Sequence, residues 1–294
     1  MNTPRLRKAM LDYEASLTPS TLASELGHSE ATVPGWRANL SWSEEGWGQR
    51  PVDRFATIHN RHFAGGLPSL PDIFLTGWLI GLLTVFYLFE VVVDGGVTSR
   101  LLDGPSIEAV VAMGGNTWQL TAGRGEWWRL LSAVMLHGSF MHLLMNSVSL
   151  YSVGGFVERV FDRSALLTVF VLTGLAASGT TEMLASHHTV SIGASGSVCG
   201  ILGFLIAIGV RGPNEFVARL KANTINLVML AFIGMAPNVD NWGHIGGLLS
   251  GVALAFAYPH FGKRVRAVLA LFSGVLLACC ALWMTILFFV ISSQ

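Results

Sequence analysis

Two short motifs place a possible nucleophile and a possible base in apolar surroundings. Ser195 lies between Gly193 and Gly196, just before a hydrophobic stretch, and His244 begins another apolar stretch further along the chain. Peptide hydrolysis needs an activated nucleophile, a general base and donors for the developing oxyanion. A serine hydroxyl and an imidazole can fill the first two roles. Polar groups inside a membrane are costly and usually functional, so we expect a hydrolase whose active site lies within the bilayer.

Two further side chains have the chemistry of oxyanion donors. His142 and Asn146 are spaced i,i+4, which places both on one face of a helix. Ser195 itself stands at the expected start of a helix, where backbone N–H groups are free and the helix dipole favours a negative charge. We therefore expect His142, Asn146 and the Ser195 backbone to face the same reaction centre.

The composition indicates a membrane protein. Hydrophobic residues make up 52% of the 294 residues and charged residues only 12%, whereas soluble domains carry about 25% charged residues. The formal net charge of zero argues against nucleic acid as the main partner. The three cysteines lie in apolar runs, so no disulfide framework is indicated.

Apolar runs of membrane-spanning length must position these polar groups. A bilayer helix needs roughly 20 apolar residues, and the chain contains seven segments near that length. We expect spans at residues 74–93, 140–160, 165–184, 195–210, 222–236, 244–258 and 265–291. Residues 1–72 are polar and are expected to form a small cytosolic extension, possibly helical.

The basic residues predict an orientation. They follow the second, fourth and sixth spans, whereas segments 186–193 and 237–243 contain no Lys or Arg. The positive-inside rule then puts the N-terminus in the cytoplasm and the C-terminus outside. Both spans that carry Ser195 and His244 run inward from the outer side, so the two residues arrive at matching depth. We expect a multi-pass protein of the cell (inner) membrane.

Other interpretations of these residues are weaker. His137, His142 and His244 could bind a metal, but no carboxylate or cysteine is placed to complete a zinc set, so we expect no metal and no cofactor. Residues 22–36 resemble a helix-turn-helix, yet Pro34 and Gly35 would break its second helix and no basic stripe accompanies it. A transporter would need polar residues along a complete path, which the chain lacks.

The ordered motifs resemble the rhomboid intramembrane serine proteases. The resemblance covers residues 74–258. It rests on Glu126-Trp127-Trp128-Arg129 in the first loop, His137, the HxxxN pair His142 and Asn146, the Gly154-Gly155-x-x-Glu158 ending, Gly193-x-Ser195-Gly196, and His244 with Gly247 and Gly251. The last two glycines are expected to let the spans of Ser195 and His244 approach closely.

The resemblance implies an all-α polytopic membrane fold. A six-helix catalytic core would occupy residues 73–260 and an additional C-terminal transmembrane helix residues 261–294. It also implies a catalytic Ser195–His244 dyad without an acidic third member, and an oxyanion hole from His142, Asn146 and the Ser195 backbone. The partners would be the lipid bilayer and transmembrane protein substrates, while nucleic acid is not expected and the oligomeric state stays open.

One position departs from the family pattern. Four residues after the nucleophile, rhomboids commonly carry an aromatic ring that stacks on the catalytic histidine, whereas this chain has Cys199. We expect this difference to affect rate or substrate choice rather than reaction type. The competing interpretation is a catalytically silent rhomboid-like protein that binds or escorts transmembrane clients. Such proteins typically lack the serine or the histidine, and both are present here.

Overall fold

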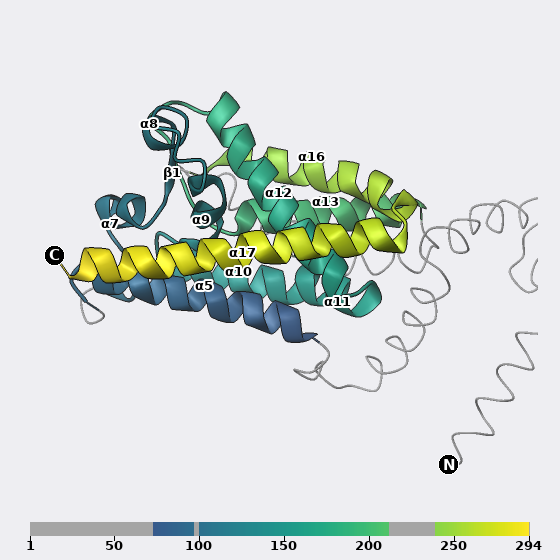
Figure 1. Ribbon diagram of the computed structural model, residues 1–294, viewed down its shortest axis with the longest axis horizontal. Coiled ribbons are helices and arrows are strands. Elements are labelled where there is room, and N and C mark those ends of the chain that lie inside the picture. The colour runs from purple at the N-terminus through teal and green to yellow at the C-terminus, as the bar shows by residue number, and fades with distance from the viewer. Residues whose placement is uncertain (1–72, 97–99, 212–238, 294) are drawn as a thin grey trace, which may run out of the picture. The chain divides into compact units, whose positions relative to one another are not determined.

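The computed structural model describes residues 73–96, 100–211 and 239–293, all within the unit Gln49–Gln294. The described chain is mostly helical (Figure 1). The polar extension of residues 1–72 and the expected span at 222–236 lie outside the described residues.

Within the described ranges, four helical segments are long and apolar enough to cross a membrane. They are α5 (Phe74–Val93), the segment Phe140–Val160, α12 (Arg163–Leu184) and α17 (Lys263–Ser292). The second segment is built from α10 (Phe140–Ser149), a π-helical turn η4 (Leu150–Gly154) and α11 (Gly155–Val160). These bounds follow the apolar runs because, without water, a spanning segment must satisfy its backbone groups internally.

Two shorter apolar helices carry the candidate nucleophile and base. These are α13 (Ser195–Arg211) and α16 (Asn241–Ala257), which η5 (Tyr258–His260) extends by a short 3-10 turn. Both pack against α12, and Figure 1 shows the three helices together. Helix α16 begins before His244 because Asp240 caps it, accepting a hydrogen bond from the Gly243 N–H.

The close approach of α13 and α16 depends on glycine. A Cβ on Gly247 would clash with the carbonyl oxygen of Gly196, and one on Gly251 would clash with that of Gly200. Packing of helix backbones at this distance is typical of small-xxx-small motifs in membranes. The approach expected from the Gly247 and Gly251 spacing is therefore observed.

The first loop, between α5 and α10, is itself structured. It contains α7 (Ile107–Ala112), β1 (Asn116–Thr117), α8 (Trp118–Thr121) and α9 (Arg129–Met135). Strand β1 pairs antiparallel with β2 (Val190–Ser191), which directly precedes the nucleophile loop. A short ladder therefore connects the first loop to the candidate site.

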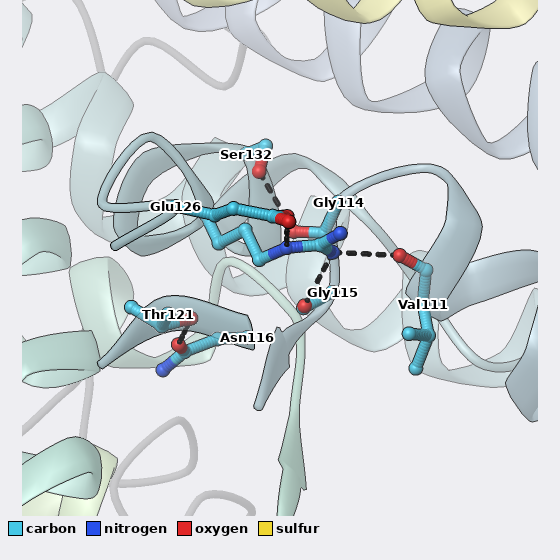
Figure 2. Close-up of polar contacts among 8 residues, drawn as sticks. Val111, Gly114, Gly115, Asn116, Thr121, Glu126 and Ser132 are labelled. Atoms are coloured by element: carbon cyan, nitrogen blue, oxygen red, sulfur yellow. Dashed lines mark hydrogen bonds and ion pairs between the residues drawn. The ribbon is translucent and has the colours of Figure 1, made fainter. Parts of the chain in front are cut away.

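A buried arginine, Arg129, holds this loop together, and Figure 2 labels its partners Val111, Gly115 and Glu126. The Arg129 guanidinium donates to the carbonyl oxygens of Val111 and Gly115, at 2.6 and 3.0 Å, and to the Glu126 carboxylate at 2.7 Å. The side chain is only 6% exposed. The fork of guanidinium donors thus binds two carbonyls and one carboxylate of the first loop at once.

Glu158 has a comparable role at the other end of α5. Its carboxylate accepts from the backbone N–H groups of Leu75 and Thr76, both at 2.8 Å, and from the Thr76 hydroxyl at 2.7 Å. The N-cap residue Ile73 offers no side-chain acceptor. A carboxylate from another helix therefore satisfies the free N–H groups at the start of α5.

The C-terminal helix α17 packs against α5, α12 and α9, and Figure 1 shows it running alongside α5. Phe288 stacks on Phe89 of α5, with ring centroids 4.1 Å apart. Trp283 meets the edge of Trp128 in the first loop at 5.8 Å. The helix therefore contacts the segment that the tryptophan–arginine motif occupies.

Candidate active site

The side chains of Ser195 and His244 form a hydrogen-bonded pair. Ser195 Oγ lies 2.7 Å from His244 Nε2, although the two residues are 49 positions apart in the chain. Ser195 is the first residue of α13, and His244 lies in the first turn of α16. When Nε2 is unprotonated it can accept the hydroxyl proton, which is the arrangement required of a nucleophile and its general base.

The loop before Ser195 is fixed by backbone contacts. Gly193 adopts a φ of 112°, a conformation that favours glycine, and its N–H donates to the Ala133 carbonyl at 2.8 Å. Just before it, Ser191 of β2 pairs with Asn116 of β1. The candidate nucleophile Ser195 therefore follows a segment held both by α9 and by the first-loop strand.

His142 and Asn146 lie beside this same loop. A Cβ on Gly193 would come within 2.6 Å of His142 Nε2 and 3.6 Å of Asn146 Nδ2. Helix α10, which carries both residues, is capped by Ser139, whose hydroxyl accepts from the His142 N–H. The structure thus brings the two expected oxyanion donors to the residue that stands two positions before Ser195.

A small pocket adjoins the candidate nucleophile and base. It measures about 20 Å³ and is bounded by α12, β2, the Gly193 loop, α13 and α16, with Ser195, His244 and Asp240 among its lining residues. A cavity of this size holds about one water molecule. Polar lining groups and room for water are what a hydrolytic centre needs.

His137 stands behind the expected oxyanion donors. Its ring is fully buried and meets the His142 ring edge-on, with centroids 5.0 Å apart. Its backbone N–H donates to the carboxylate of Glu90, which is itself fully buried in α5. Burial lowers the pKa of the His137 imidazole well below its ordinary value.

Two acidic residues near the site were not identified from the sequence. Glu90 could have been noticed, because it is the only acidic residue in the first apolar run and charged groups there are rarely incidental. Asp240 gave a weaker signal, a possible helix cap four residues before His244.

The other motif residues support the site from a distance. Trp128, Arg129 and Glu158 do not line the pocket, and they act in the first loop and at the start of α5. Cys199, at the position where rhomboids commonly carry an aromatic ring, is 1% exposed. Across the described residues, no three His, Cys, Asp or Glu side chains are grouped so as to hold a metal ion.

Comparison with known proteins agrees with these features. Residues 124–261 match the family model of the Rhomboid domain. Over 216 residues the chain is 33% identical to the rhomboid protease GluP of Bacillus subtilis, covering 71% of this chain and 39% of GluP. It is 33% identical over 174 residues to RHOMBOID-like protein 5 of Arabidopsis thaliana, covering 56% of each.

A shorter relative is covered more completely. The putative rhomboid protease YdcA of B. subtilis is 31% identical over 143 residues, which are 47% of this chain and 71% of YdcA. For GluP and the plant protein, by contrast, the chain spans less than two thirds of the relative's length. Together with the apolar helices, these matches identify a multi-pass membrane protein. The chain belongs to the rhomboid family.

Proposed function

We propose that this protein is an intramembrane serine endopeptidase that cleaves transmembrane segments of other membrane proteins. The observation that carries the proposal is the 2.7 Å contact between Ser195 Oγ and His244 Nε2, at one end of two closely packed apolar helices. Rhomboid proteases among the relatives support it. The silent-binder alternative gains no support from a site in which nucleophile and base are both present and hydrogen-bonded.

The chemistry follows from the geometry of the pair. Ser195 Oγ attacks the scissile carbonyl carbon while its proton passes to His244 Nε2, forming a tetrahedral intermediate. His244 then gives this proton to the leaving amine, and the peptide C–N bond breaks. A water molecule, deprotonated by His244, attacks the acyl ester. His244 returns that proton to Ser195 Oγ as the ester bond breaks, which releases the acid and regenerates the serine hydroxyl. The small pocket beside the pair has room for that water.

The oxyanion is stabilised by donors on α10 and α13. In the proposed site, the backbone N–H of Ser195 and the side chains of His142 and Asn146 surround the developing negative charge. Their positions around Gly193 support these roles. Asn146→Ala should lower kcat by about a hundredfold, because removing one such donor costs about 3 kcal/mol. An unchanged kcat in this variant would remove Asn146 from the oxyanion hole.

The proposed architecture is a six-helix catalytic core, residues 73–260, followed by one C-terminal transmembrane helix, residues 261–294. Residues 1–72 form a cytosolic extension. The first turn of α17 contains Lys263, Arg264 and Arg266. This turn follows the C-terminal end of α16, whereas His244 lies near the N-terminal end of that helix. By the positive-inside rule the C-terminal end of α16 is cytoplasmic, so the C-terminus of the chain lies outside. The proposed location is the cell (inner) membrane.

The decisive experiment uses the purified protein in liposomes with a fluorogenic transmembrane substrate. We expect cleavage by the wild type and none by Ser195→Ala or His244→Ala. A fluorophosphonate probe, which reacts with activated serines, should label the wild type only. The matched control is Ser197→Ala, because Ser197 lies on the same helix but donates to the Phe170 carbonyl instead.

The outcomes separate the two functions. Cleavage and labelling that persist in Ser197→Ala and disappear in Ser195→Ala would establish the nucleophile. A folded wild type that neither cleaves any transmembrane substrate nor reacts with the probe would contradict the protease and favour the silent binder.

A further inference from the structure

The carboxylate of Asp240 joins three elements beside the nucleophile and base. Its Oδ1 accepts from the Gly243 backbone N–H at 2.9 Å and so caps α16. Its Oδ2 accepts from the hydroxyls of Thr181 on α12 and Ser191 on β2, both at 2.5 Å. One side chain therefore holds α12, α16 and the strand before the nucleophile together.

The positions of these partners along the chain give the contacts their significance. Ser191 stands four residues before the nucleophile Ser195, and Asp240 stands four residues before the base His244. Asp240, Ser191, Ser195 and His244 also line the same pocket. The Asp240–Ser191 hydrogen bond is thus a second link between the two segments whose ends carry the reacting pair.

The bonding of Asp240 exceeds what a helix cap requires. A cap needs one acceptor for one free N–H, whereas Asp240 also receives two hydroxyl donors from other elements. Gly243 makes room for this arrangement. A Cβ there would lie 2.6 Å from Asp240 Oδ2 and 3.0 Å from Thr181 Oγ1. The carboxylate can therefore settle over the end of α16 only because residue 243 has no side chain.

We propose that Asp240 is a positioning residue, whose carboxylate fixes the strand before Ser195 relative to the helix of His244. It acts through Ser191, Thr181 and the α16 backbone rather than on the substrate. The inference rests on the proposed protease function for its effect on rate. A misplacement of about 1 Å between reacting groups can cost about a hundredfold in rate, so loss of this link should reduce turnover.

The test compares Asp240→Ala and Asp240→Asn with the wild type in liposomes. We expect kcat and the rate of fluorophosphonate labelling to fall at least about tenfold in Asp240→Ala, within the range that misplacement produces. KM should stay near the wild-type value, because no substrate contact is lost. The kcat and labelling rate of Asp240→Asn should lie between those of the wild type and Asp240→Ala, because asparagine keeps one acceptor oxygen and loses the other.

A matched control separates positioning from helix capping. Asp162 caps α12 by accepting from the Ala165 N–H at 2.8 Å, so Asp162→Ala loses a comparable cap elsewhere. We expect it to lower thermal stability as Asp240→Ala does but to label at the wild-type rate. A folded Asp240→Ala variant that labels at the wild-type rate would overturn the inference. So would an Asp162→Ala variant that loses as much labelling as Asp240→Ala does.

A second variant covers the case in which Asp240→Ala does not fold. Thr181→Val combined with Ser191→Ala removes both hydroxyl donors and leaves the α16 cap in place. It should reproduce the loss of kcat, and wild-type kcat in this variant would overturn the proposal.

Hydrogen exchange makes the test independent of catalysis. In the Ser195→Ala background, Asp240→Ala should increase exchange in residues 190–195 as well as in the first turn of α16. Increased exchange confined to α16 would mean that Asp240 acts only as the N-cap of that helix, and it would overturn the inference. If the wild type proves inactive, only the proposed function fails, because the exchange result still decides whether Asp240 positions the strand.

Discussion

The α13–α16 interface and the contacts of α17 are built in opposite ways. In α16 the buried residues are four glycines and one alanine, and glycine faces glycine backbone across the interface. Helix α17 is much longer, yet only Ser273, Cys280 and Met284 are buried among its 30 residues. Its contacts with α5 and the first loop come instead from large rings, Phe288 on Phe89 and Trp283 on Trp128.

The difference reflects how accurately each helix must be placed. Backbone packed on backbone leaves no side-chain rotamers that could absorb a shift, so the distance between α13 and α16 has little freedom to change. That accuracy is needed where Ser195 meets His244. Rings on long side chains can adjust, and they suit a helix that supports the first loop without carrying a reacting group.

Gly251→Ala should have the largest effect on labelling and stability. The new Cβ would clash with the Gly200 carbonyl oxygen, so α13 and α16 must separate. We expect fluorophosphonate labelling of Ser195 to be lost and the free energy of unfolding to fall by about 1 to 3 kcal/mol, as overpacking produces. Thermal unfolding in detergent and labelling in liposomes measure the two effects. Wild-type labelling in this variant would show that the helices tolerate separation.

The sequence indicated the candidate site residues more fully than the contacts that support them. Ser195, His244, His142 and Asn146 stand in short patterns whose chemistry is local. The structure pairs Ser195 with His244 and places His142 and Asn146 beside Gly193. The apolar runs likewise gave the bounds of α5 and α17 to within two residues, because a spanning helix must be continuously apolar.

The supports could not be predicted because they depend on partners far apart in the chain. The β1–β2 ladder is only two residues long, too short for an alternating pattern. Arg129 belongs to a motif that the sequence reveals, but that motif does not identify the carbonyls that Arg129 binds. The contact of Trp283 with Trp128 depends on how α17 packs, whereas its sequence indicated only an additional C-terminal transmembrane helix.

Trp283→Ala should have an intermediate effect, since it removes a ring contact but no backbone packing. We expect the free energy of unfolding to fall by about 1 kcal/mol, the value of an aromatic pair. Labelling of Ser195 should decline only slightly, because Arg129 still holds the first loop. Leu282→Ala is the matched control, since Leu282 is its neighbour and 64% exposed. If Trp283→Ala abolished labelling, α17 would belong to the catalytic machinery.

Gly274→Ala should have the smallest effect. It tests whether α17, unlike α16, tolerates a side chain in place of a glycine. It makes in α17 the same substitution that Gly251→Ala makes in α16. A Cβ on Gly274 would lie 3.5 Å from Leu167 Cδ2, an ordinary van der Waals contact with a flexible side chain. Alanine also favours a helix over glycine by about 0.5 to 1 kcal/mol. We therefore expect wild-type labelling and equal or slightly higher thermal stability, measured beside Gly251→Ala. A large loss of stability would mean that α17, like α16, is held at a fixed distance by glycine.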